Sequence, residues 1–206
     1  MRISPVTPQR LVERIVDLVL ARTGRVRLVI DGAPPTRPHE LARAISDRLR
    51  IEGRLAIPIS AEDFLRPASL RFERGRTNPD TLLTDWLDVG GLRREVLGPA
   101  ALDGSGRVLP RLWDARVDRA YRAEYVQLPV DGVVVLSGSL LLGRSLPVDL
   151  AVHLHMSPAQ LARRLAPDEQ WTVSAYERYA RDHEPLRRAD LVVLADHPER
   201  PALREP

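Results

Sequence analysis

The chain of 206 residues contains neither lysine nor cysteine, so its 31 basic side chains are all arginine and disulfides, thiolate nucleophiles and cysteine-ligated zinc are excluded. Hydrophobic residues make up 44% of the sequence, enough to bury a core. The net charge is only +3 and the arginines are interspersed with 28 acidic residues, which argues against a nucleic-acid partner.

No apolar run approaches the roughly 20 residues needed to cross a bilayer. The first residues also lack the charged-then-apolar layout of a signal peptide. We therefore expect one domain spanning residues 1–206, located in the cytoplasm, with no membrane partner. The sequence leaves open whether the protein forms a homo-oligomer.

The first predicted elements are a helix, a strand and a second helix. Apolar residues at helical spacing predict an amphipathic helix from about Pro8 to Ala21, ended by a turn at Thr23-Gly24. Val26–Ile30 is a short apolar run of branched residues, typical of a buried strand. Turn residues and a helical pattern through Leu49 follow it.

Four further apolar runs predict strands at Leu55–Ile59, Gly132–Leu136, Val148–Leu154 and Asp190–Leu194. Nearly continuous apolar strands separated by helical stretches indicate a parallel sheet covered on both faces. The expected fold class is α/β, a doubly wound parallel sheet of about five strands. Turn residues and aromatics at about 103–128 predict a small irregular or hairpin insertion.

The loop after the first strand has the frame of a phosphate-binding loop, GxxxxGK[S/T]. Counting from Gly32 places Arg37 at the second glycine, Pro38 at the lysine and His39 at the Ser/Thr position. The prolines in this loop have no NH to donate, and Pro38 lacks the charge that a lysine brings to phosphate. A tight connection from strand to helix, with Pro38 near the first helical position, is the alternative interpretation.

The segments from about Arg25 to Pro198 resemble, in order, the uridine kinase branch of the P-loop kinases. The similar segments are Val29–Gly32, Ser60–Phe64, Arg71–Arg76, Leu92–Val96, Gly104–Arg107, Trp113-Asp114 with Asp118-Arg119, and Arg188–Val193.

The resemblance implies ATP-dependent phosphorylation of a nucleoside-like hydroxyl, with ATP and Mg²⁺ as cofactors. It assigns Asp63 as the catalytic base, with Glu62 beside it, because a carboxylate can orient or deprotonate the acceptor. Asp114 and Arg119 fall in the acceptor-binding region, where Trp113 and Tyr121 could stack on a ring or belong to the local core. Arg163 and Arg164 match the start of the family's lid, or form a solvated helix face.

The sequence departs from the family at the metal site and the lid. Ser137 stands where the family has an acidic residue, and His39 replaces the metal-binding hydroxyl. The segment after Arg164 is shorter than a long charged lid. We interpret the chain as a uridine kinase-like pseudokinase with a degenerate phosphate loop, which binds or regulates through a nucleoside- or nucleotide-like ligand. The alternative is an active kinase with ATP and Mg²⁺, in which Arg37 replaces lysine and Asp63 is the base.

Two other sequence patterns give little indication of function. His153 and His155 share one face of a predicted strand, which suits either two zinc ligands or a polar sheet face. Spacing identifies no third ligand, so we predict no metal site. Ser137 and Ser139 flank Gly138 but lack the glycine pattern of a hydrolase nucleophile, which disfavours serine hydrolysis.

Overall fold

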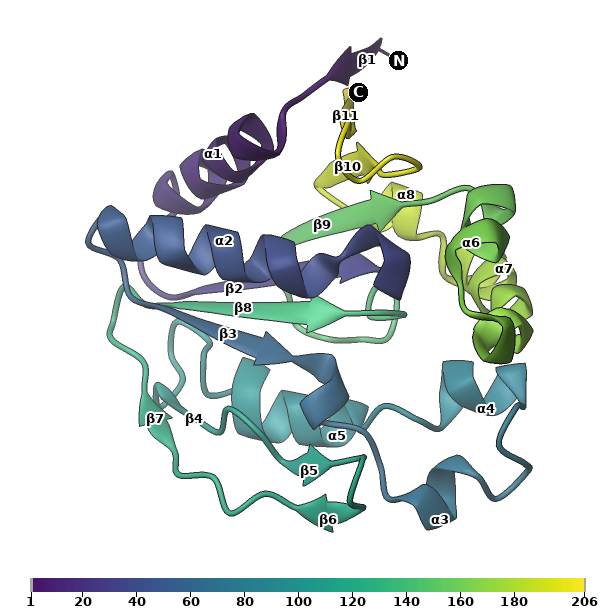
Figure 1. The fold of residues 1–206 in the computed structure, drawn as a ribbon. Helices are drawn as coiled ribbons and strands as arrows, with labels where there is room; N and C mark the ends of the chain where they lie inside the picture. The colour runs from purple at the N-terminus through teal and green to yellow at the C-terminus, as the bar shows by residue number, and fades with distance from the viewer. Residues whose placement is uncertain (1, 206) are drawn as a thin grey trace.

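A seven-stranded sheet forms the centre of the structure, which is a computed structural model describing residues 2–205 (Figure 1). The strands of this sheet are β1 (Arg2–Pro5), β2 (Val26–Gly32), β3 (Ala56–Ser60), β8 (Val133–Gly138), β9 (Leu150–His155), β10 (Leu191–Leu194) and β11 (Ala202–Glu205). Their spatial order is β1-β11-β10-β9-β2-β8-β3. Five adjacent strands, β10, β9, β2, β8 and β3, are parallel. Strand β11 pairs antiparallel with β10, and β1 pairs antiparallel with β11.

Helices connect these strands and cover the sheet. The α-helices are α1 (Pro8–Leu20), α2 (Pro38–Ile51), α3 (Ala68–Arg71), α4 (Pro79–Thr84), α5 (Val89–Leu92), α6 (Pro158–Arg164), α7 (Val173–His183) and α8 (Pro185–Arg188). Short 3₁₀ segments are η1 (Pro34–Thr36), η2 (Ala61–Asp63) and η4 (Pro167–Thr172), and a π-helical turn, η3 (Arg93–Leu97), continues α5. In the described residues no helix is long and apolar enough to cross a membrane.

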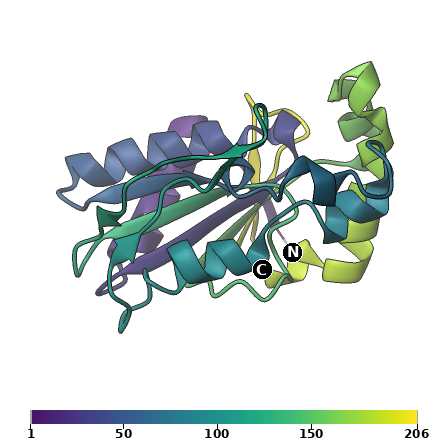
Figure 2. The same ribbon diagram turned by 90° about the horizontal axis from the view of Figure 1, so that it is seen from below.

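The sheet separates two hydrophobic cores. Buried residues of α1 and α2 pack on one face together with Leu28, Ile30 and Val152. Buried residues of α5 and η3 pack on the other face with Val29 and Leu136. Figure 2 shows the strands fanned between these two sets of helices. The predicted doubly wound α/β fold is thus confirmed, with two antiparallel edge strands added to the five parallel ones.

Helix α1 follows the predicted amphipathic pattern. The Thr7 side chain accepts a hydrogen bond from the Arg10 NH at 3.3 Å, and Pro8 occupies the first helical position, where it loses no hydrogen bond. Leu11 and Ile15 are buried against the sheet. The helix ends one residue earlier than predicted, before a turn in which Gly24 has φ 72°.

The predicted insertion contains two short antiparallel pairs beside the main sheet. The pairs join β4 (Arg107–Val108) to β7 (Val126–Gln127) and β5 (Trp113–Asp114) to β6 (Arg119–Ala120). Figure 1 shows them below the edge strand β3. The β5–β6 register sets Asp114 opposite Arg119.

A buried arginine joins three chain segments at the amino end of the parallel strands. Arg54 is 7% exposed, and its Nε donates to the Asp131 carbonyl at 2.6 Å. Its Nη1 donates to the carbonyls of Val19 at 2.7 Å and Arg22 at 3.0 Å, and its Nη2 donates to that of Gly24. Burial lowers the pKa of Arg54, and Asp131 opposes the shift.

Replacing Arg54 by methionine is expected to lower the free energy of unfolding by about 2–4 kcal/mol, because several carbonyls lose a charged donor at once. Urea denaturation measures the change. Arg43→Met, at an exposed position on α2, is the matched control and is expected to change stability by about 0.5 kcal/mol or less. Equal stability of the two variants would contradict the bracing role of Arg54.

Candidate functional site

The loop between β2 and α2 closes on itself. The Thr36 NH donates to the Ala33 carbonyl at 2.8 Å, and the Arg37 NH donates to the Pro34 carbonyl at 3.0 Å. The Thr36 hydroxyl also donates to the Ala33 carbonyl, at 2.7 Å, and Thr36 is only 5% exposed. A phosphate loop presents such NH groups to its ligand. Here two are used internally and the three prolines contribute none.

Gly32 permits this closed conformation. A Cβ at Gly32 would collide with the Thr36 hydroxyl and would lie 2.8 Å from Leu154 Cβ. The glycine therefore serves close packing of the loop on β9. This is the structural role of a tight connection, with Pro38 buried as the first residue of α2.

Arg37 lies at the outer edge of the loop. Its φ is 57°, in the left-handed region, and its side chain is 51% exposed. The guanidinium pairs with Glu199 at 2.8 Å and with Glu40 at 3.8 Å. The side chain is thus engaged with carboxylates of α2 and of the segment after β10.

His39 joins the ends of two strands through its ring. Its Nδ1 lies 2.8 Å from Ser137 Oγ at the end of β8, and its Nε2 lies 3.2 Å from Glu62 Oε1 in η2, after β3. The hydrogen bond from His39 lowers the pKa of Glu62, against the raising effect of burial. Three residues from α2, β8 and η2 therefore form one network at the carboxyl end of the sheet.

The residues in this network do not fit a nucleotide-bound magnesium ion. Mg²⁺ takes oxygen ligands in near-octahedral geometry. Glu62 is the one carboxylate of the network, and it is paired with His39. Across residues 2–205, no group of three or more His, Asp or Glu side chains is arranged to hold a metal ion.

The acidic pair after β3 is divided between two environments. Glu62 contacts the loop through His39, whereas Asp63 Oδ2 lies 3.5 Å from Arg111 Nε in the insertion. Burial raises the pKa of Asp63, and Arg111 and Tyr121 oppose the shift. The structure therefore brings Glu62 to the loop and Asp63 to the insertion.

The remaining predicted residues lie in the insertion, where Asp114 is half-buried, and on the exposed face of α6. Asp114 accepts a hydrogen bond from the Arg116 NH at 2.9 Å, and Arg119 is exposed on β6. Arg163 and Arg164 are exposed on α6, and Arg164 Nη2 donates to the Asp196 carbonyl at 2.9 Å. Neither arginine of α6 lines the cavity described next.

A cavity of about 260 Å³ opens beside the loop. The loop, η2 and the chain after β8 form one side, while α4, η4 and α7 form the other. Pro34 and Glu62 line it, together with three residues that the sequence did not single out: Trp86, Arg144 and Tyr176. Burial raises the pKa of Tyr176 to about 12, and a hydrogen bond with Ser139 opposes the shift. No motif marks these three residues, because they come from separate segments.

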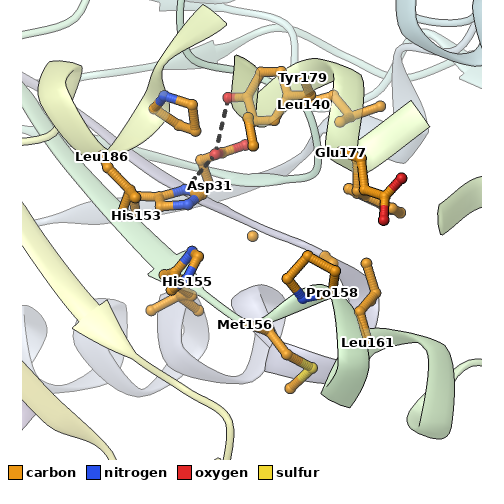
Figure 3. A pocket seen from close by; sticks show the side chains of 16 residues that line it. Asp31, Leu140, His153, His155, Met156, Pro158, Leu161, Glu177, Tyr179 and Leu186 are labelled. Carbon is orange, nitrogen blue, oxygen red and sulfur yellow. Dashed lines mark hydrogen bonds and ion pairs between the residues drawn. The ribbon is translucent and has the colours of Figure 1, made fainter. Parts of the chain in front are cut away.

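A second, smaller cavity of about 70 Å³ adjoins a buried carboxylate (Figure 3). Asp31, at the end of β2, is fully buried and accepts hydrogen bonds from the Leu141 NH at 2.9 Å and the Tyr179 hydroxyl at 2.9 Å. Its other neighbour is His153 Nδ1, at 2.7 Å. Burial raises the pKa of Tyr179 well above its ordinary value, and Asp31 adds to the shift.

The two histidines of β9 have different surroundings. His153 is held by Asp31, as Figure 3 shows. The pKa of His155 is lowered by burial and by the neighbouring His153. The pair thus belongs to a buried polar face of the sheet, the second of the two interpretations of the sequence.

The fold is similar to that of several solved structures. No protein-family model and no curated protein matches the sequence. Among solved structures, a possible uridine kinase from Bacillus stearothermophilus has a TM-score of 0.72 and 22% identity, covering 89% of this chain and 97% of that one.

Two further solved structures share this fold. A candidate fructose transport system kinase from Silicibacter sp. TM1040 has a TM-score of 0.64 and 22% identity over 87% of this chain and 94% of that one. The D-glycerate 3-kinase from Cryptococcus neoformans var. grubii has a TM-score of 0.51 and 16% identity over 88% and 71%. The resemblance to the uridine kinase branch is thus confirmed at the level of the fold.

Replacing His39 by alanine is expected to raise the pKa of Glu62 toward its ordinary value, because the hydrogen bond that stabilises the carboxylate is lost. In the native protein this pair stabilises the fold above the unfolded pKa of Glu62, and the stabilisation is lost as the pH falls through the lower folded pKa. The contribution is small, since the Glu62 side chain is 64% exposed.

Carboxyl-resolved NMR titration measures this pKa. His197→Ala, at an exposed position outside the network, is the control and leaves the titration of Glu62 unchanged. An unaltered Glu62 titration in His39→Ala would show that the two side chains do not interact in solution.

Proposed function

We propose that this protein is a pseudokinase: a P-loop kinase fold that binds a nucleoside- or nucleotide-like small molecule without using ATP and Mg²⁺ to phosphorylate it. Kinases of this fold have two half-sites. The donor half-site holds the nucleotide phosphates and the metal, and the acceptor half-site holds the molecule to be phosphorylated. Our proposal is that the first is lost and the second is retained.

The network of His39, Ser137 and Glu62 carries this proposal. Phosphoryl transfer depends on positioned cations that neutralise phosphate charge. The two positions from which the family binds magnesium are occupied by an imidazole and a serine hydroxyl, 2.8 Å apart and hydrogen bonded to each other. Neither supplies an anionic metal ligand. The same imidazole also engages the Glu62 carboxylate, at 3.2 Å.

The geometry of the loop supports the same conclusion. Its NH groups at Thr36 and Arg37 are already hydrogen bonded to carbonyls of the loop, so phosphate binding would require their disruption. The Arg37 side chain pairs with Glu199, and replacement of the missing lysine would require this ion pair to break.

The cavity of about 260 Å³ supports the ligand-binding part of the proposal. It lies between the end of β3, the end of β8 and the lid-like segment η4–α7, where parallel α/β sheets bind their ligands. Its volume is near the lower end of the usual range for small-molecule sites, roughly 300–1,000 Å³. A metabolite-sized ligand therefore fits better than a large cofactor.

We expect isothermal titration calorimetry to detect no binding of ATP with Mg²⁺, and coupled assays to detect no ADP release with uridine or other nucleosides as acceptors. The closed loop and the missing metal ligands are the physical reason. Acceptor-dependent ADP release that disappears in both Asp63→Asn and Arg37→Ala would instead establish an active kinase with Arg37 in place of lysine.

A repaired loop tests the same proposal from the opposite direction. Combining Arg37→Gly, Pro38→Lys and His39→Thr restores the glycine, the cation and the hydroxyl, and is expected to create measurable ATP binding by calorimetry. The control is Arg37→Gly alone, which restores neither charge nor hydroxyl and is expected to leave ATP unbound. If the folded triple variant binds ATP no better than the native protein, the loop is not the cause of the loss.

A further inference from the structure

The chain that follows β8 carries an arginine into the wall of the 260 Å³ cavity. Arg144 is half-buried, and its Nη2 donates to the Thr84 carbonyl at 3.2 Å. No ion pair joins Arg144 to a carboxylate within the described part of the chain. Burial lowers the pKa of Arg144, and the neighbouring Tyr179 and Asp85 oppose the shift. A guanidinium has five NH donors, so most of the donors of Arg144 have no partner among the described residues.

The backbone around Arg144 is strained. Leu140 has φ 60° and Ser145 has φ 56°, both in the left-handed region that residues with a Cβ rarely adopt. Each such residue costs about 1–3 kcal/mol unless the surroundings impose the conformation, and such residues cluster at ligand-binding sites. These two left-handed residues flank the four-residue segment 141–144, which carries Arg144.

The buried carboxylate of Asp31 imposes this conformation. The NH of Leu141 donates to Asp31 Oδ1 at 2.9 Å, and the NH of Leu142 donates to the Tyr179 hydroxyl at 2.8 Å. The Tyr179 hydroxyl donates in turn to Asp31 Oδ2 at 2.9 Å. The segment that carries Arg144 is thus anchored at two consecutive NH groups, which holds the guanidinium at the cavity.

A second donor lacks a partner in the same wall. Trp86 lines the cavity, and its buried indole NH has no hydrogen-bond acceptor within the described residues. The ring is held by edge contact with Phe72, at a centroid distance of 5.5 Å, and by Trp171, at 5.8 Å. The two aromatic neighbours thus fix the Trp86 ring as part of the cavity wall.

The other polar groups of the cavity limit where negative charge fits. Glu62 is paired with His39, and Glu169 is exposed on η4 at the rim. Both would repel an anion placed near them. Leucines are the most frequent residues in the remaining wall, among them Leu65, Leu82 and Leu140, and Ser139, Thr172 and Tyr176 also line it. The favourable position for an anionic group is therefore the end of the cavity at Arg144.

We infer that the ligand of this cavity is a small molecule that carries one oxyanion, bound by Arg144, on an apolar or planar body that packs against the leucines and Trp86. This inference rests on the proposed function and names the ligand class of the same cavity. Guanidinium groups bind carboxylates and phosphates through the same paired hydrogen bonds. An uncharged nucleoside would leave Arg144 without an anionic partner among the described residues.

Calorimetry with two matched pairs of probes tests this inference: uridine against uridine monophosphate, and uracil against its 6-carboxylate, orotate. In at least one pair, the anion is expected to bind about 10-fold or more tightly than its neutral partner, the gain from one charged hydrogen bond. A preference confined to the first pair identifies a phosphate ester, and one confined to the second identifies a carboxylate.

Variants of Arg144 assign the preference to this residue. In Arg144→Met the anion and its neutral partner are expected to bind equally, whereas Arg144→Lys keeps part of the preference because it keeps the charge. Arg14→Met, at an exposed position on α1, is the matched control and keeps the full preference. Thermal unfolding verifies that each variant is folded, and a preference that persists in folded Arg144→Met overturns the inference.

The outcomes separate this inference from the proposed function. Equal binding of neutral and anionic probes by the native protein overturns the oxyanion assignment but leaves the ligand-binding pseudokinase in place. Binding of none of the four probes overturns the ligand class. Phosphorylation of uridine with release of ADP overturns the proposed function itself, whatever the charge preference.

Discussion

The buried carboxylate of Asp31 is the interaction on which the site depends. It stands near the end of β2, the middle one of the five parallel strands, two residues before the start of the closed loop, and contacts the chain after β8, the ring of His153 and the hydroxyl of Tyr179. A fully buried carboxylate is stable only when its oxygens are paired. Satisfying Asp31 therefore fixes the relative positions of β2, β9, α7 and the segment that carries Arg144.

The loop between β2 and α2 and its neighbours satisfy one another's polar groups. A phosphate loop leaves NH groups and a cation unsatisfied in the free protein, to be satisfied by the nucleotide. In this chain the loop NH groups donate to loop carbonyls, and the Arg37 side chain forms an ion pair with Glu199. The His39 ring contacts Ser137 and Glu62. Internal partners replace those that a ligand would provide.

The 260 Å³ cavity has the opposite character. Trp86 has an indole NH without an acceptor, and Arg144 has a guanidinium without a paired carboxylate in the described residues. Both groups line one cavity. A guanidinium that lacks a paired carboxylate in a cavity wall favours a ligand that carries negative charge. The contrast between the loop and the cavity agrees with the pseudokinase that we propose.

The sequence by itself determined the fold class, the five parallel strands and the departures from a phosphate loop, because these depend on local hydrophobic pattern and on residue type at fixed spacing. Only the tertiary structure decided which polar groups meet. The antiparallel pairing of β1 with β11 joins the two ends of the described chain. No local sequence pattern predicts a pairing between segments so far apart in the chain. The contacts of His39 with Ser137 and Glu62, and the cavity of Trp86 and Arg144, likewise join residues from distant segments. Periodicity predicts which side of an element is buried, but the partners of a buried polar group follow from strand order, which brings distant chain segments to one edge of the sheet.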